Sequence, residues 1–204
     1  MLSQLLSSWR QPTAATETGD GTHYIFKSSL AGGARQLMLT DAGLTVQSAG
    51  VQLWPLDSIT SIRLSYRPAS MQAWRFRADI ATSSGQSITV FSTTWHSISQ
   101  MARQDQDYRT FIVELHRRLQ RAGSHVSLTA GINPVLYVAG LVVMGLIGLA
   151  IAGLFVRALI TAEFVGGLFL AGFAAWFTWQ IGGFMRRNRP RKYTFDALPD
   201  DVLP

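Results

Sequence analysis

Four arginines are the residues of this 204-residue sequence best suited to bind a ligand. Arg63 and Arg67 fall in one segment of alternating apolar and polar residues, and Arg75 and Arg77 fall in the next. Because alternate side chains of a strand share a face, we expect all four on one face of adjacent strands. Guanidinium groups bind phosphates and carboxylates through paired hydrogen bonds. Three interpretations remain open: an anionic head group, a protein partner, or a solvated outer face partly neutralised by Asp79.

The other reactive side chains form no catalytic or metal-binding pattern. The chain has four histidines: His23, His96, His116 and His125. None pairs with another at helical spacing, and His116 is expected on the exposed side of a helix. Asp105 and Asp107 suit a helix cap and first turn better than a metal–phosphate grip. No nucleophile elbow, P-loop or dinucleotide-binding motif occurs, and there is no cysteine, so we expect no enzyme, metal or cofactor.

The arginines belong to a sheet-rich region, residues 23–123. Period-2 alternation predicts about seven antiparallel strands, at 24–26, 35–40, 44–46, 51–54, 59–66, 74–80 and 87–91. The period then changes to that of one amphipathic helix, whose apolar stripe is Tyr108, Phe111, Ile112, Leu115 and Leu119. Gly123 is the expected stop. The fold class is therefore α+β.

The segment from Leu39 to Leu44, followed by that from Leu53 to Ile62, resembles bacterial pleckstrin-homology-like domains. In those domains a hairpin precedes a strand entered through a proline and an Asp/Ser-Ile step, as at Pro55 and residues 57–59. The resemblance covers about residues 20–122. It implies a bacterial source, a seven-stranded antiparallel barrel or sandwich capped by a helix, and binding of lipid head groups or proteins.

Two long segments, 134–156 and 164–185, contain no charged residue. As helices rising about 1.5 Å per residue, both are long enough for a hydrocarbon core of about 30 Å. The short link between them predicts a transmembrane hairpin over residues 132–185. Lys and Arg flank the outer ends of the two segments, whereas the link carries only Arg157, so we expect both termini in the cytoplasm.

Small residues recur at four-residue spacing in both apolar segments: Gly148 and Ala152, then Gly167, Ala171 and Ala175. Such rows let helix backbones approach closely. They predict packing of the two helices on each other, with a second copy of the chain or another membrane subunit as the alternatives. Neither segment holds an ionisable residue, which argues against a channel or transporter acting alone.

The two ends differ in character. Residues 1–22 predict a short amphipathic helix, with Leu2, Leu5, Leu6 and Trp9 on one side, and then a polar linker. Residues 186–204 form a basic, proline-containing tail that is expected to be extended. Its apolar residues predict docking on the domain or on a partner, with disorder as the alternative; they are Tyr193, Phe195, Leu198, Val202 and Leu203.

The net charge of +6 is explained by basic residues that flank the membrane, so no nucleic acid is expected. We expect a multi-pass protein of the bacterial cytoplasmic (inner) membrane that contacts membrane lipids. Its expected role is that of a non-enzymatic adaptor or accessory subunit, which binds a protein partner or a larger membrane complex at the membrane surface. The alternative role is recognition of anionic lipid head groups by the arginine-lined face.

Overall fold

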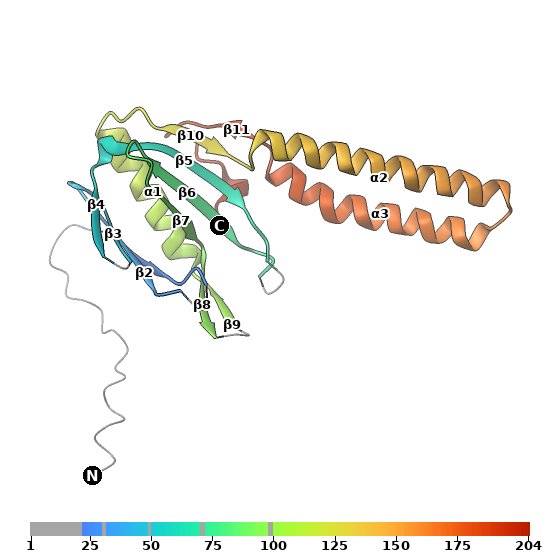
Figure 1. Cartoon of the computed structure of the whole chain (residues 1–204), viewed down its shortest axis with the longest axis horizontal. Helices are drawn as coiled ribbons and strands as arrows, with labels where there is room; N and C mark the ends of the chain where they lie inside the picture. The colour runs from blue at the N-terminus through green and yellow to red at the C-terminus, as the bar shows by residue number, and fades with distance from the viewer. Residues whose placement is uncertain (1–21, 30–31, 49, 70–71, 98–99) are drawn as a thin grey trace, which may run out of the picture.

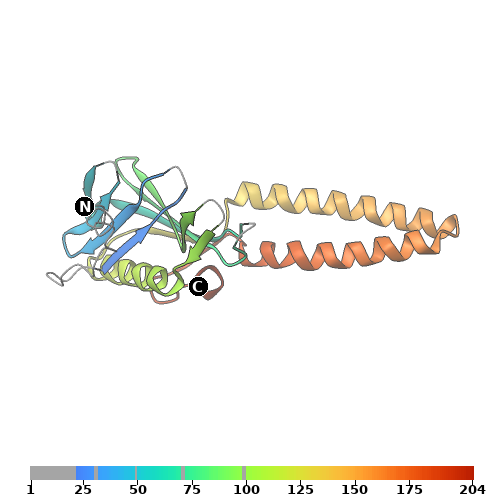
Figure 2. The ribbon, with the colours of Figure 1, turned by 90° about the horizontal axis from the view of Figure 1, so that it is seen from below.

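The computed structural model describes residues 22–29, 32–48, 50–69, 72–97 and 100–204. A sheet-rich domain lies at one end, and two long helices project from it side by side (Figures 1 and 2). The amphipathic helix and linker predicted for residues 1–22 lie outside the described residues, apart from Thr22.

The first sheet has four antiparallel strands in the order β1-β2-β3-β4. They are β1 (Thr22–Phe26), β2 (Arg35–Thr40), β3 (Gly43–Gln47) and β4 (Val51–Trp54). The predicted turn before residue 44 requires glycine, because Gly43 has φ +147° and a Cβ there would lie 2.3 Å from the Trp54 carbonyl oxygen. These four strands lie where the alternation of apolar residues in the sequence predicted them.

The second sheet has five strands in the order β11-β10-β5-β6-β7. They are β5 (Ile59–Tyr66), β6 (Phe76–Thr82), β7 (Ser87–Phe91), β10 (Ser127–Ala130) and β11 (Arg191–Lys192). Strand β10 pairs parallel to β5, and β11 pairs antiparallel to β10. The structure thus extends the domain beyond residue 123, since β10 and part of the tail belong to it.

Helix α1 (Asp105–Arg121) closes the space between the two sheets (Figure 1). All five residues of its predicted apolar stripe are fully buried, and Gly123, at φ +65°, follows its end. The predicted cap at Asp105 is wrong: the N-cap is Gln104, and Asp105 lies in the first turn, where it pairs with Arg103. The helix is held by packing rather than by a side-chain cap.

A small hairpin that the sequence did not predict, β8 (Thr93–Ser97) with β9 (Gln100–Arg103), lies between β7 and α1. It contacts β1, where the Lys27 amide donates to Thr94 Oγ1 at 2.9 Å. Two short 3-10 helices, Leu56–Ser58 and Asp200–Val202, also belong to this domain.

The long helices are α2 (Pro134–Ile160) and α3 (Phe164–Arg187), and they pack against each other. Both are long and apolar enough to cross a membrane. Helix α2 runs to Ile160, so the predicted link, which began at Arg157, is reduced to residues 161–163. Asn133 caps α2, because its side-chain oxygen accepts a hydrogen bond from the Val135 amide at 2.9 Å.

Asn188 joins the end of α3 to the domain. Its fully buried side chain donates to the Tyr66 carbonyl at 2.9 Å and accepts from the Tyr66 amide at 3.0 Å. Its carbonyl also accepts from the Ile132 amide. Close contact here requires Gly131, at φ +87°, since a Cβ at this position would lie 2.5 Å from the Asn188 carbonyl oxygen. The helices are therefore fixed to β5 and β10 rather than tethered loosely.

Candidate functional site

The predicted arginine cluster lies around the outer face of the five-stranded sheet. Along β5 and β6 the inward residues, such as Ile62 and Ala78, are fully buried, and Arg63 and Arg77 alternate with them. Arg67 and Arg75 lie just beyond the strand ends, where the Arg67 amide donates to the Arg75 carbonyl at 2.8 Å. The structure thus brings the four arginines to adjoining positions of one β5–β6 hairpin.

Two of these arginines, Arg77 and Arg75, have protein partners, and a third, Arg67, is partly buried with no hydrogen-bond partner for its Nε among the described residues. Arg77 forms an ion pair with Asp79 at 2.7 Å. Arg75 stacks over the Phe91 ring, 3.8 Å from its centroid, and donates to Thr93 Oγ1. Arg67 is partly buried, and burial, with Arg77 nearby, lowers the pKa of its guanidinium. Asp79 thus neutralises Arg77, and Phe91 and Thr93 hold the Arg75 side chain in place.

Arg63 differs from the other three. It is exposed, and its Nε donates only a long hydrogen bond, 3.4 Å, to Thr129 Oγ1. Among the described residues, no carboxylate lies within ion-pair distance of it. It lines a shallow polar pocket of about 420 Å³ with Arg77, Asp79 and a set of hydroxyl and small residues: Ser61, Ala81, Ser87, Thr89, Ser127 and Thr129.

Arg63 also lines a second pocket, here called the junction pocket, where the domain meets the long helices. Its volume is about 240 Å³, and its lining residues are Arg63, Thr129, Ala130, Ile132, Pro134, Pro190, Arg191 and Lys192. Three basic residues thus line this pocket together with small apolar residues and prolines, and most of its exposed lining is apolar. Neither β10 nor β11 was predicted, so the sequence did not bring Arg191 and Lys192 together with Arg63.

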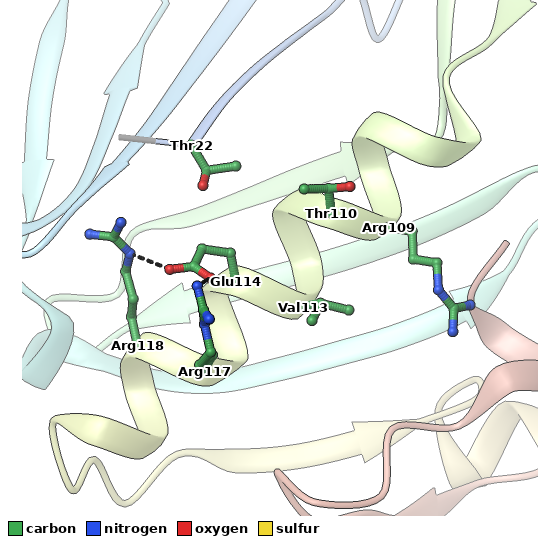
Figure 3. Close-up of a pocket in the computed structure, with 7 residues that line it drawn as sticks. All are labelled: Thr22, Arg109, Thr110, Val113, Glu114, Arg117 and Arg118. Carbon is green, nitrogen blue, oxygen red and sulfur yellow. Dashed lines mark hydrogen bonds and ion pairs between the residues drawn. The ribbon is translucent and has the colours of Figure 1, made fainter. Parts of the chain in front are cut away.

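A wider groove of about 660 Å³ follows one side of α1 next to Thr22 (Figure 3). Its arginines are paired within the chain. Glu114 lies between Arg117 and Arg118 and forms ion pairs with both, and Arg118 also reaches Asp41 at 2.7 Å. Arg109, farther along the helix, donates to the Pro204 carbonyl at 2.7 Å. The groove is therefore an internal ion-pair network with little spare positive charge.

The C-terminal tail packs on its own domain. Val202 and Leu203 belong to the core, and three further tail residues pack against it while partly buried: Tyr193, Phe195 and Leu198. The Tyr193 hydroxyl lies 2.8 Å from His116 Nε2. The sequence left docking on the domain, docking on a partner and disorder open for the tail. In the structure the tail docks on its own domain.

The prediction that His116 is exposed is wrong. Its side chain is buried, and Nδ1 donates to the Ile112 carbonyl at 2.7 Å, so Nε2 is left to accept from Tyr193. Burial lowers the pKa of the ring. The tail covers this side of α1, which the helical pattern alone does not reveal.

The small residues of α2 and α3 are divided between the helix contact and an open cleft. Gly167 is buried and faces Phe155 and Ala158. Three other predicted residues, Gly148, Ala152 and Ala171, line a cleft of about 290 Å³ between the two helices. The rest of its lining is Ile151, Phe155, Leu170 and Ala174. Ala175 is exposed, and its neighbour Ala174 takes the expected place. The cleft faces outward along the helix pair.

Within the described ranges, no group of three histidine or acidic side chains is placed to hold a metal ion. No known protein family, curated protein or solved structure matches this chain. Among the described residues that line the pockets above, Arg63 and Lys192 are exposed cations without an ion pair.

Proposed function

We propose that this chain is a membrane-anchored, non-enzymatic adaptor of the bacterial cytoplasmic membrane, whose pleckstrin-homology-like domain binds a protein partner. The strand order supports the family assignment: a four-stranded sheet, then β5, β6 and β7, then helix α1. The β8–β9 hairpin, β10 and β11 are additions to that plan. The assignment agrees with the resemblance of residues 39–62.

In this proposal α2 and α3 cross the membrane as a hairpin with both outer ends in the cytoplasm. Helix α2 has no buried residue, although its residues are almost all apolar. Such a surface requires lipid or another protein around it. Arg186 and Arg187 in the last turn of α3 agree with a cytoplasmic end, since basic residues accumulate on that side.

The orientation can be tested by labelling single cysteines in intact cells, since the chain has no cysteine of its own. A cysteine at Thr161, between the helices, should react with a membrane-impermeant maleimide added outside the membrane. A cysteine at Ser83, in the turn after β6, should react only after the membrane is opened. The reverse pattern would contradict the proposed orientation.

The observation that carries the adaptor function is the free edge of the four-stranded sheet. Strand β4 pairs with β3 on one side and with no described strand on the other. Val51 and Leu53 on it are 69% and 54% exposed. The pairing register lines them up with Ile25 and Met38, which are also exposed. An open edge beside apolar side chains is suited to adding an extended segment of a partner as a further strand.

A photo-crosslinking residue placed at Leu53 tests this edge in intact membranes. We expect one dominant crosslinked protein from position 53. The control is the same residue at Val113, an exposed apolar position on α1. Equal adducts from both positions, or none from position 53, would overturn the proposed partner surface.

A second function, recognition of an anionic lipid head group, is favoured by a specific observation. Of the four arginines, Arg63 is the exposed one; it has no carboxylate partner among the described residues and borders two pockets. Lipid binding and partner binding use different parts of the domain, so one chain can perform both.

A further inference from the structure

We propose that the junction pocket binds the phosphate of an anionic phospholipid from the cytoplasmic leaflet. The proposal rests on α2 and α3 crossing the membrane. It differs from the original arginine-face hypothesis in its residues: Arg63 acts with Arg191 and Lys192 of β11, while Arg67, Arg75 and Arg77 are not required.

The first argument is charge. The pocket is lined by three cations, and one of them, Arg191, forms an ion pair with Asp201. Three positive charges and one negative charge leave a formal charge of +2. Arg63 has only its hydrogen bond to Thr129, and Lys192 is exposed with no ion pair among the described residues. An anion that binds here gains two cations that the fold itself leaves unpaired.

The second argument is the position of the pocket. Pro134 is the first residue of α2, and Pro190 follows the end of α3 at Arg187 by three residues. Head groups occupy a layer outside the hydrocarbon core that is roughly 5–8 Å thick on each side. Residues that immediately flank the apolar spans lie at this depth. The anionic lipids of the cytoplasmic leaflet attract basic residues at this position.

The third argument is the combination of apolar and basic lining. Ala130, Ile132 and the two prolines make the lining of the pocket largely apolar, and Arg63, Arg191 and Lys192 complete it. A phospholipid can place its phosphate on the cations and its glycerol region on the apolar lining. The N-terminus of α2 adds the positive end of a 27-residue helix. Free phosphate would use the cations alone.

The test uses the full chain purified in a neutral detergent and titrated with dioleoyl phosphatidylglycerol or dioleoyl phosphatidylcholine, with bound lipid counted by native mass spectrometry. We expect one saturable phosphatidylglycerol per chain, and phosphatidylcholine bound at least tenfold more weakly. The double variant Arg63→Gln/Lys192→Gln should weaken phosphatidylglycerol binding by about thirtyfold, the loss expected for two basic side chains at an anionic surface.

Matched variants separate charge from folding. Arg63→Lys/Lys192→Arg keeps both charges and should bind phosphatidylglycerol within about threefold of the wild type. Arg121→Gln removes an exposed cation on α1, away from the pocket, and should bind like the wild type. Unchanged binding by the Gln/Gln variant would overturn the proposal, as would an equal loss in Arg121→Gln.

A parallel titration with inorganic phosphate identifies the source of the anion. Displacement of the lipid by phosphate at equal concentration would overturn the lipid assignment and point to a soluble anion. Extraction of membranes at high pH provides the separate test of the hairpin. A chain that stays in the membrane but binds no phosphatidylglycerol refutes the pocket alone, whereas a chain that is released refutes the anchoring proposal beneath it.

Discussion

The C-terminal tail provides the most direct test of the fold. Val202 is fully buried and Leu203 is only 3% exposed, although both belong to the proline-containing tail. We predict that Leu203→Ala destabilises the domain strongly. If the tail were a solvated extension, the same substitution would change nothing.

The expected size follows from burial. Truncating a fully buried leucine to alanine costs about 2–5 kcal/mol, from lost transfer free energy and the cavity that remains. Neighbouring side chains that relax into such a cavity reduce the loss, so the lower half of this range is expected. Val51→Ala is the control, because Val51 is 69% exposed. Substitution at such a surface position usually changes stability by less than about 0.5 kcal/mol.

The measurement is urea denaturation of the full chain in neutral detergent, followed by tryptophan fluorescence, since Trp54 lies in the domain core. If the free energy of unfolding of each variant changes with urea concentration at the same slope as that of the wild type, the shift in the midpoint urea concentration gives the change in the free energy of unfolding. A shift for Leu203→Ala as small as that for Val51→Ala would refute the inclusion of the tail in the core.

Three further predictions concern glycine, histidine and tyrosine. Gly131 and Gly85 both have positive φ, but only at Gly131 would an added Cβ meet a carbonyl oxygen. Gly131→Ala should therefore destabilise the domain by more than Gly85→Ala, for which backbone strain of roughly 1–3 kcal/mol is expected. Burial lowers the pKa of His116, so between about pH 7.5 and about pH 5.5 the unfolded chain takes up a proton that the folded chain does not. The free energy of unfolding should therefore fall as the pH drops through this range, and it should fall less in His116→Gln. Tyr24→Phe should cost about 1 kcal/mol, whereas Tyr108→Phe should be neutral or stabilising, because only the Tyr24 hydroxyl has a hydrogen-bond partner among the described residues.

All three are measured by the same denaturation experiment. Equal losses for the two glycine variants would mean that the contact with the Asn188 carbonyl does not constrain the fold. Parallel pH profiles for the wild type and His116→Gln would remove the buried histidine as the source of acid sensitivity. A larger loss for Tyr108→Phe than for Tyr24→Phe would show that the Tyr108 hydroxyl is satisfied by water.

Local patterns predicted the elements whose boundaries are set by neighbouring residues. Strands β2 and β5 were recovered because each alternates over six or eight residues. Strands β10 and β11 were missed because they have only four and two residues, and their pairing joins positions far apart, such as Ala130 and Arg191. The hairpin of β8 and β9 was missed because its residues are mostly polar and show little alternation.

The same distinction explains the site. Alternation correctly placed Arg63 and Arg77 on one side of the sheet. The ion pair of Arg77 with Asp79 joins alternate residues of one strand and agrees with the partial neutralisation that the sequence indicated. Alternation gave no means of knowing that Arg63 lies beside β10, because that depends on strand order. His116 follows the buried Ile112 by four residues, so its position was already close to the apolar stripe. The covering tail, however, comes from residues beyond 190.

Asn188 gives these separate features a common consequence. Its side chain and carbonyl bind β5 and the segment after β10, so the end of α3 is held at two places of the sheet that carries the junction pocket. A domain attached by a flexible linker samples many tilts, and a head-group site on it meets the membrane only part of the time. Here the pocket is built from the same strands that receive the helices, so its distance from the ends of α2 and α3 is fixed. At the proposed lipid site, such fixed placement would lower the entropic cost of binding, and it would hold the free edge of β4 at one position relative to the helices for the proposed partner.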